Sequence, residues 1–205
     1  MQQRTLVLAS ASPRRRQLLT ALGLDFRVEP THVDESSEEP DPLRRASQLA
    51  LRKGRAAARA QPRATVITAD TIVVLDGRVL GKPDGAEEAA AMLGSLRARR
   101  HEVVSAVAVA AEGREAVEAA TTAVTMRDYG ADEIERFIER GEPFDKAGGY
   151  AVQDAEFAPA ESVDGCLCAV IGLPLWTVRG LLARVAGIET VPPAFQRCAA
   201  CPLRT

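Results

Sequence analysis

The alternation of apolar and polar residues along the chain predicts strands and helices in alternating order. Residues 5–9 and 64–69 are short apolar runs, which indicate buried strands. Residues 12–23 and 41–60 open with Ser-Pro and Asp-Pro, which are helix-start signals. The chain is therefore predicted to begin with a strand, two helices and a second strand, in that order.

Antiparallel signals follow in the second half. An Asp-Gly turn at residues 76–77 lies between two apolar runs and predicts a hairpin. Residues 102–110 and 115–126 read as two long strands around a second turn. Helical patterns cover residues 84–99 and 173–185, with a short helix at 131–139 between them. The fold class is thus α/β, with a mixed, largely antiparallel twisted sheet flanked by helices.

Composition narrows the function classes. The chain has 205 residues, a formal net charge of −2, 46% hydrophobic and 4% aromatic residues. These values fit one compact domain and argue against a polyanion-binding protein, which would carry a basic face and stacking aromatics. No run approaches the roughly 18 apolar residues of a membrane helix. We expect a cytoplasmic protein without nucleic-acid or membrane partners, comprising a domain over residues 1–187 and a loose tail over 188–205.

The cysteines form two close pairs, Cys166/Cys168 and Cys198/Cys201. Together they offer the four ligands that a zinc site needs. The pairs are far apart in sequence, however, and the second lies in the predicted tail. We therefore expect free, reduced thiols rather than a zinc site, as is usual in a cytosolic enzyme.

The first strand–helix junction carries an electrostatic conflict. The segment from Ser10 to Arg16 reads Ser-Ala-Ser-Pro-Arg-Arg-Arg. It places three arginines in the first turn of a helix, where the helix dipole is already positive. Hydroxyl groups, free backbone N–H groups and guanidinium groups converge there, so the segment predicts a phosphate-binding site. The alternative is a solvated arginine cluster paired with the acidic loop over residues 34–39.

Carboxylates supply the second candidate feature. Asp70 follows an apolar strand, and Asp34 and Glu35 are adjacent acids in a loop. A carboxylate beyond the carboxyl end of a strand lies where open α/β sheets bind ligands. It can hold a divalent cation or accept a proton from water. Isolated acids of this kind are also common as caps or surface charges.

Lysine is rare in this chain. Only Lys53, Lys82 and Lys146 are lysines among 26 basic residues. One interpretation is that a retained lysine marks a position where a planar guanidinium does not fit and a compact ammonium does. The alternative is that the scarcity of lysine is chance. Lys82 and Lys146 lie in turns rich in Gly and Pro, where ligand contacts concentrate. Lys53 alone reads as a solvated charge on the second helix.

Several of these segments, in order, resemble the Maf family of nucleoside triphosphate pyrophosphatases over about residues 5–185. The matching segments are Ser10-Ala-Ser-Pro-Arg-Arg15, Gln17-Leu-Leu19, Ala69-Asp-Thr71, Gly81-Lys-Pro83, Asp145-Lys-Ala-Gly148, Gln153 and Gly172-Leu-Pro174. Each is weak alone, whereas the full series in register is specific. The resemblance implies a fold like that of inosine triphosphate pyrophosphatases, with a nucleotide cleft between two lobes.

The resemblance also implies hydrolysis of a nucleoside triphosphate to a monophosphate and pyrophosphate with Mg²⁺ or Mn²⁺. Asp70 matches the family's proton acceptor, and with Glu35 it is the expected metal site; Lys82 completes the expected catalytic group. The expected substrate-binding residues are Ser10, Ser12, Arg14, Arg15, Lys53, Thr71, Asp145, Lys146 and Gln153. Among them, Arg14, Thr71 and Gln153 match positions that distinguish dTTP/UTP-preferring members. A homodimer is the implied oligomer.

Three segments depart from the family pattern. The chain has Gly165-Cys-Leu-Cys168 before the last apolar run, Asp154 where a glycine is usual, and Arg97-Ala-Arg-Arg-His101 where Ser-Gly-x-x-His is usual. We expect His101 to pack or cap rather than to perform chemistry. The first two departures leave the base preference open, so a broad or modified-nucleotide (7-methyl-GTP-like) pyrophosphatase is one alternative. A nucleotide-sensing regulator of cell division without turnover is another.

The lysine pattern generates a test. We expect Lys82→Arg to lose most pyrophosphatase activity although the positive charge is kept, because the planar guanidinium is bulkier than the ammonium it replaces. Pyrophosphate release from UTP measures the effect, with Arg78→Lys as the control for an exchange between the same two residue types. Full activity in Lys82→Arg would show that a guanidinium serves as well as an ammonium at this position.

Overall fold

The computed structural model describes residues 5–195 and 197–204, which form a mixed α/β fold around one twisted seven-stranded sheet. The strand order is β2-β1-β3-β5-β6-β7, with β4 pairing to β3 outside this path. The strands are β1 (Leu6–Leu8), β2 (Arg27–Val28), β3 (Thr65–Leu75), β4 (Arg78–Leu80), β5 (Arg100–Ala111), β6 (Arg114–Met126) and β7 (Ala160–Asp164). β1 runs parallel to β2 and β3, and the other pairings are antiparallel. The predicted fold class is confirmed.

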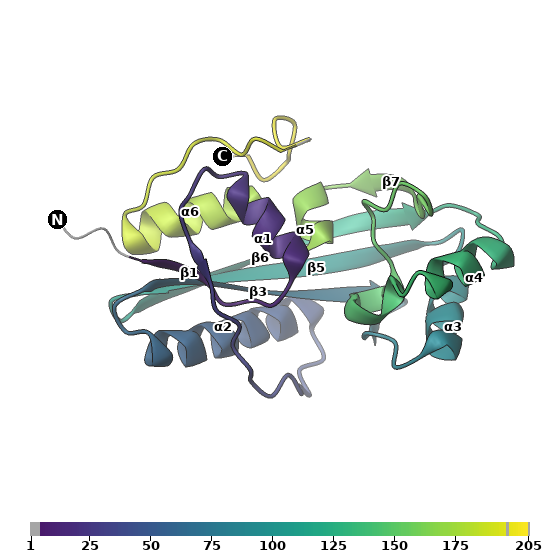
Figure 1. Cartoon of the computed structure of the whole chain (residues 1–205), viewed down its shortest axis with the longest axis horizontal. Coiled ribbons are helices and arrows are strands. Elements are labelled where there is room, and N and C mark those ends of the chain that lie inside the picture. The colour runs from purple at the N-terminus through teal and green to yellow at the C-terminus, as the bar shows by residue number, and fades with distance from the viewer. Residues whose placement is uncertain (1–4, 196, 205) are drawn as a thin grey trace.

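Helices cover both faces and one end of the sheet (Figure 1). The α-helices are α1 (Pro13–Thr20), α2 (Pro42–Ala60), α3 (Ala86–Leu96), α4 (Ala131–Glu139), α5 (Leu167–Ile171) and α6 (Leu175–Ala186). Two 3-10 turns, η1 (Pro143–Asp145) and η2 (Ala147–Gly149), follow α4. Helix α2 lies on one face of the sheet and α1 and α6 on the other, whereas α3 and α4 lie at the far end.

The hydrophobic core is divided in the same way. One cluster joins α1, α5 and α6 to the centre of the sheet through residues such as Leu19, Leu173 and Leu182. A second cluster around Tyr129 and Phe137 joins α3 and α4 to the other end of β3, β5 and β6. Two smaller clusters, which include Ala50 and Ala57, pack α2 onto the opposite face of the sheet. The two large clusters lie toward opposite ends of one continuous sheet and form the cores of the two lobes.

Strand β3 differs from its prediction. The sequence suggests an apolar strand ending before Asp70, followed by a separate hairpin. The structure has one 11-residue strand that continues through Asp70 and Thr71 to the hairpin with β4. Asp70 therefore lies in the middle of a strand, opposite Ala106 of β5. The polar pair interrupts the apolar pattern because those two side chains line a cavity.

The open edge of β3 explains the position of that cavity. Strand β1 pairs with residues 65–67 of β3, and β4 pairs with residues 73–75 along the same edge. Residues 68–72 have no strand partner there among the described residues. Asp70 and Thr71 lie within this gap, just past the carboxyl end of β1, which is where α/β sheets place ligands.

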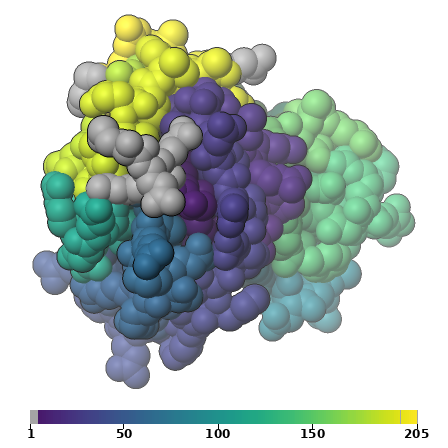
Figure 2. Space-filling view, turned by 60° about the vertical axis from the view of Figure 1, so that its left-hand side comes forward, coloured from purple at the N-terminus to yellow at the C-terminus, as the bar shows by residue number. Residues whose placement is uncertain are grey.

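The C-terminal segment is packed onto the domain, contrary to the expectation of a loose tail. Its described residues form no helix or strand, yet the backbone N–H of Ala194 donates to the Ala21 carbonyl at 3.0 Å. The Trp176 indole Nε1 donates to the Cys198 carbonyl at 2.8 Å. Figure 2 shows the segment in yellow, adjoining the N-terminal part of the chain in purple. No helix in the described part of the chain is long and apolar enough to cross a membrane.

His101 is packed inside the second lobe, as expected. It is 2% exposed, and its Nε2 lies 2.7 Å from the Tyr150 hydroxyl, while Nδ1 is buried without a hydrogen-bond partner. Burial disfavours the imidazolium and lowers the pKa of His101 to about 4. His101 is therefore neutral in the folded protein near neutral pH, and it binds a proton less readily in the folded protein than in the unfolded chain.

This predicts a pH dependence of stability. The unfolded chain binds a proton at His101 near pH 6.5, whereas the folded protein binds it only near pH 4. The contribution of neutral His101 to stability is therefore complete above pH 6.5 and is lost as the pH falls toward 4. When the pH is lowered from 7 to 5, this effect of His101 should lower the free energy of unfolding of the wild type by about 1–2 kcal/mol. Urea titrations at both pH values should show a smaller loss for His101→Gln than for wild type. His32→Gln, at the exposed histidine, should behave like wild type; equal losses in all three proteins would contradict the account.

Candidate active site

A cavity of about 400 Å³ opens over the unpaired edge of β3 and lies between the two lobes. Every residue that the sequence analysis assigned to the site lines it, although these residues come from six separate parts of the chain. They are Ser10, Ser12, Arg14, Arg15, Glu35, Lys53, Asp70, Thr71, Lys82, Asp145, Lys146 and Gln153. The cavity thus brings five cationic side chains and three carboxylates together in a chain whose net charge is −2.

The start of α1 forms one wall. Ser12 is the N-cap, and its hydroxyl accepts a hydrogen bond from the Arg15 backbone N–H at 3.4 Å. The Ser10 hydroxyl accepts from the Ser12 N–H at 3.3 Å. Pro13 occupies the first helical position, where its missing N–H is not needed. The two hydroxyls therefore fix the geometry of the junction, and Arg16 points away from the cavity as an exposed residue.

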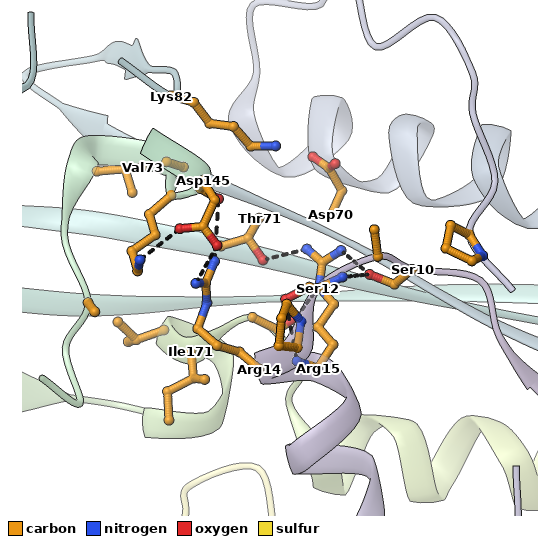
Figure 3. Close-up of a pocket in the computed structure, with 18 of the residues that line it drawn as sticks. Ser10, Ser12, Arg14, Arg15, Asp70, Thr71, Val73, Lys82, Asp145 and Ile171 are labelled. Atoms are coloured by element: carbon orange, nitrogen blue, oxygen red, sulfur yellow. Dashed lines mark hydrogen bonds and ion pairs between the residues drawn. The ribbon is translucent and has the colours of Figure 1, made fainter. Parts of the chain in front are cut away.

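Arg15 is held in one orientation by three acceptors from different elements (Figure 3). Its Nε donates to the Gly172 carbonyl at 3.0 Å. Its two terminal nitrogens donate to the hydroxyls of Ser10 and Thr71, each at 3.3 Å. Burial lowers the pKa of Arg15, but an arginine stays charged across the physiological range. A fixed, half-buried guanidinium is a strong anion-binding group because little entropy is lost when the anion arrives.

The direction of the hydrogen bonds around Thr71 can be assigned. Ser105 donates its hydroxyl proton to the Ala169 carbonyl at 2.6 Å. The contact between the Thr71 and Ser105 hydroxyls, at 2.9 Å, must therefore use the Thr71 proton. Thr71 in turn accepts from Arg15, so a directed chain runs from Arg15 through Thr71 and Ser105 to the backbone of α5. The sequence analysis missed Ser105, although a lone serine within the apolar run of residues 103–110 was a signal.

Asp70 and Glu35 share a cation. Lys53 Nζ lies 2.7 Å from Asp70 Oδ1 and 3.0 Å from Glu35 Oε2. Lys53 is 9% exposed, so the reading of a solvated helix charge is wrong. The second oxygen of Asp70, Oδ2, makes no hydrogen bond within the described residues and remains available. Asp34 does not line the cavity and instead bonds Ser36 in its own loop.

Asp145 and Lys146 order the opposite wall. Arg14 bonds Asp145 Oδ2 at 2.8 Å, and Lys146 bonds Asp145 Oδ1 at 2.7 Å. Burial alone would raise the pKa of Asp145, but the hydrogen bonds and charges of Lys146 and Arg14 outweigh it and lower that pKa. Lys146 also pairs with Glu142 at 3.0 Å. Asp145 therefore holds Arg14 toward the cavity, where two guanidinium groups lie side by side.

Two polar residues remain exposed to solvent in the cavity. Lys82 is exposed, and Figure 3 shows its ammonium directed toward the carboxylate of Asp70. Gln153 is exposed as well, and neither side chain makes a hydrogen bond or ion pair within the described residues. Both are free to contact a ligand. The neighbouring Asp154 turns away and caps a turn, accepting from the Phe157 N–H at 2.7 Å and pairing with Arg140.

Mg²⁺ and Mn²⁺ fit the carboxylate side of the cavity only together with a ligand. Among the described residues, no three His, Cys, Asp or Glu side chains stand in a finished metal-binding arrangement. Mg²⁺ in nucleotide enzymes is typically bound by one or two carboxylates plus substrate phosphates. Asp70 and Glu35 match that number of ligands.

Comparison with known proteins defines the class. Residues 5–185 match the family model described as Maf-like protein, so the chain belongs to the Maf family. It is 49% identical to the dTTP/UTP pyrophosphatase of Thermomicrobium roseum over 97% of this chain and 94% of that protein. It is also 49% identical to the dTTP/UTP pyrophosphatase of Moorella thermoacetica, over 90% and 96% of the two chains.

A solved structure is similar at a lower level. The Ham1 protein of Staphylococcus aureus aligns with 62% of this chain and 75% of its own, with a TM-score of 0.46 and 21% identity. A likeness of this size carries no conclusion about the chemistry of the cavity.

Gly172 is required at the point where α5 meets Arg15. Its φ of +123° lies outside the range that residues with a Cβ adopt readily. A Cβ there would lie 3.4 Å from both Arg15 Nε and Thr71 Oγ1. Glycine therefore permits the carbonyl of residue 172 to approach the guanidinium closely.

We expect Gly172→Ala to lower kcat/KM for UTP, the substrate of the named relatives, by about tenfold or more. The reason is a backbone strain of about 1–3 kcal/mol together with displacement of Arg15. Gly180→Ala is the matched control, because Gly180 lies inside α6 with nothing within 4 Å of an added Cβ. Steady-state kinetics of both variants check this. Unchanged kcat/KM in Gly172→Ala would show that the Arg15 orientation is not needed.

Proposed function

We propose that this protein hydrolyses a nucleoside triphosphate, with dTTP and UTP preferred, to the monophosphate and pyrophosphate by attack of water at the α-phosphorus. The observation that carries the proposal is the cavity itself, where cations that outnumber carboxylates surround one buried carboxylate, Asp70. The names of the relatives at 49% identity support the substrate class.

Phosphate binding is assigned to the cationic wall. Uncharged acceptors such as the Gly172 carbonyl orient Arg15, and the Asp145 carboxylate orients Arg14. Both guanidinium groups therefore face the cavity before the substrate binds. Ser10, Ser12 and Lys82 extend this donor surface. Such fixed donors stabilise the negative charge that phosphoryl oxygens carry in the transition state.

Asp70 is the proposed base. Its Oδ1 is engaged by Lys53, which leaves Oδ2 to accept a proton from the attacking water. Glu35 shares Lys53 and is placed to hold the divalent cation with Asp70. When bound with the substrate phosphates, Mg²⁺ or Mn²⁺ would supply further neutralisation of phosphoryl charge.

Base selection is assigned mainly to Gln153. The Thr71 hydroxyl already donates to Ser105 and accepts from Arg15, which leaves it one lone pair. Thr71 therefore acts chiefly by positioning Arg15. The Gln153 amide has donors and an acceptor without partners among the described residues, so it can discriminate one base edge from another by hydrogen bonds. Lys146 acts through Asp145, and the homodimer remains a prediction.

The proposal is tested at Asp70. We expect Asp70→Asn to lower kcat for UTP and dTTP by about 100-fold or more with Mg²⁺ present, because the amide cannot accept the proton. KM should rise by much less than kcat falls, since the phosphate donors and Glu35 are intact. Asp76→Asn is the control; it makes the same substitution just beyond β3, at an exposed residue paired with Arg99. Normal turnover in Asp70→Asn would show that another group activates the water.

A nucleotide panel separates the remaining possibilities. Pyrophosphate release from dTTP and UTP well above that from purine and modified triphosphates is the expected result. Equal rates across the panel would point to a broad-specificity enzyme instead. Tight nucleotide binding without any pyrophosphate release would favour a sensor.

A further inference from the structure

The four cysteines gather at one place although two sequence segments supply them. Cys166 and Cys168 lie at the start of α5, and Cys198 and Cys201 lie in the C-terminal segment. All four are free thiols, and none is more than 8% exposed. They belong to the same hydrophobic cluster, between α5 and α6. The two pairs are far apart in sequence, but the fold brings them together.

The thiols lie near one another in a continuous series. Cys168 Sγ and Cys198 Sγ are 3.4 Å apart. The Cys166 thiol is close enough to those of Cys168 and Cys201 to interact electrostatically with both. The series therefore runs from Cys201 through Cys166 and Cys168 to Cys198, and it includes all four sulfur atoms.

Both pairs are supported by the rest of the fold. The Cys166 N–H donates to the Thr122 hydroxyl of β6 at 3.1 Å, which fixes α5 to the sheet. Trp176 of α6 donates to the Cys198 carbonyl at 2.8 Å. The described residues of the C-terminal segment form no helix or strand, so few other bonds hold this segment in place. A metal joining the two pairs would supply that attachment.

We propose that Cys166, Cys168, Cys198 and Cys201 bind one structural Zn²⁺, which fastens the C-terminal segment to α5. Zinc favours four sulfur ligands in tetrahedral geometry in structural sites. Two sulfurs bound to the same zinc are about 3.8 Å apart, given Zn–S bonds of about 2.3 Å. The 3.4 Å between Cys168 and Cys198 is a thiol–thiol contact. Among the described residues, no three or more His, Cys, Asp or Glu side chains are placed so that they could hold a metal ion as they stand. Zinc binding therefore requires the thiols to rearrange, with the Cys168 and Cys198 sulfurs moving apart by a few tenths of an ångström.

The binding step balances without any redox change. Four thiols and Zn²⁺ give a tetrathiolate complex of charge −2, and four protons go to solvent. A disulfide between Cys168 and Cys198 would instead need an oxidant and would leave Cys166 and Cys201 as thiols. The closeness of Cys166 to both Cys168 and Cys201 favours a single site for all four.

The test uses the full-length chain without a histidine tag, purified under reducing conditions. Elemental analysis after exhaustive dialysis should find one zinc per chain. Replacement by Co²⁺ should give the thiolate-to-metal charge-transfer and visible bands of a tetrahedral tetrathiolate complex. Asp70→Asn should keep this zinc, because the site is separate from the cavity over β3. A wild-type chain without stoichiometric zinc or this cobalt spectrum, or one with a Cys168–Cys198 disulfide, overturns the proposal.

Variants in the C-terminal segment identify the ligands. Cys198→Ser/Cys201→Ser should lose the zinc and the cobalt spectrum, whereas Ala199→Ser/Ala200→Ser, at exposed positions between the two cysteines, should keep both. Cys201→His supplies another zinc ligand and should retain binding with a shifted cobalt spectrum, which guards against a loss caused by misfolding alone. Full zinc content in Cys198→Ser/Cys201→Ser overturns the assignment.

Discussion

The whole site depends on a difference in length between two adjacent strands. β1 stops after pairing with Ile67, whereas β3 continues to Leu75, and β4 resumes the pairing only at Val73. The backbone between these points has a partner on one side only, through β5. The chain turns away from the sheet where β1 ends, and residues Ser10–Ser12 lead it into α1. The gap thus faces the positive end of a helix, which accounts for a carboxylate and an anion-binding surface in one cavity.

Half-buried Arg15 links this gap to the rest of the molecule. Its acceptors come from the end of β1, from β3 and from the turn after α5, so they join the N-terminal, central and C-terminal parts of the chain. The same short helix, α5, begins after Cys166 and ends at Gly172, so it contacts the C-terminal segment through Cys168 and the cavity through the Gly172 carbonyl. Structural support for the cavity therefore extends well beyond the residues that line it.

The sequence allowed a good prediction of the fold and of the residues around the cavity. Capping signals located α2 and the start of α1, and the long apolar runs located β5 and β6. Periodicity could not show that β3 is a single strand, because Asp70 and Thr71 break the apolar pattern for a reason that depends on β1. Likewise, Lys53 looked like a solvated charge, since only the fold places Asp70 and Glu35 beside it. The roles of individual site residues rest on the family resemblance together with this geometry.

The central claim is that water attacks the α-phosphorus, and isotope labelling tests it most directly. UTP hydrolysed in water enriched in ¹⁸O should yield UMP with one labelled phosphate oxygen and pyrophosphate without label. Mass spectrometry of the two products distinguishes the sites of attack. Label in the pyrophosphate, or release of orthophosphate as the first product, would contradict the arrangement of Asp70 and the phosphate-binding wall proposed for this cavity.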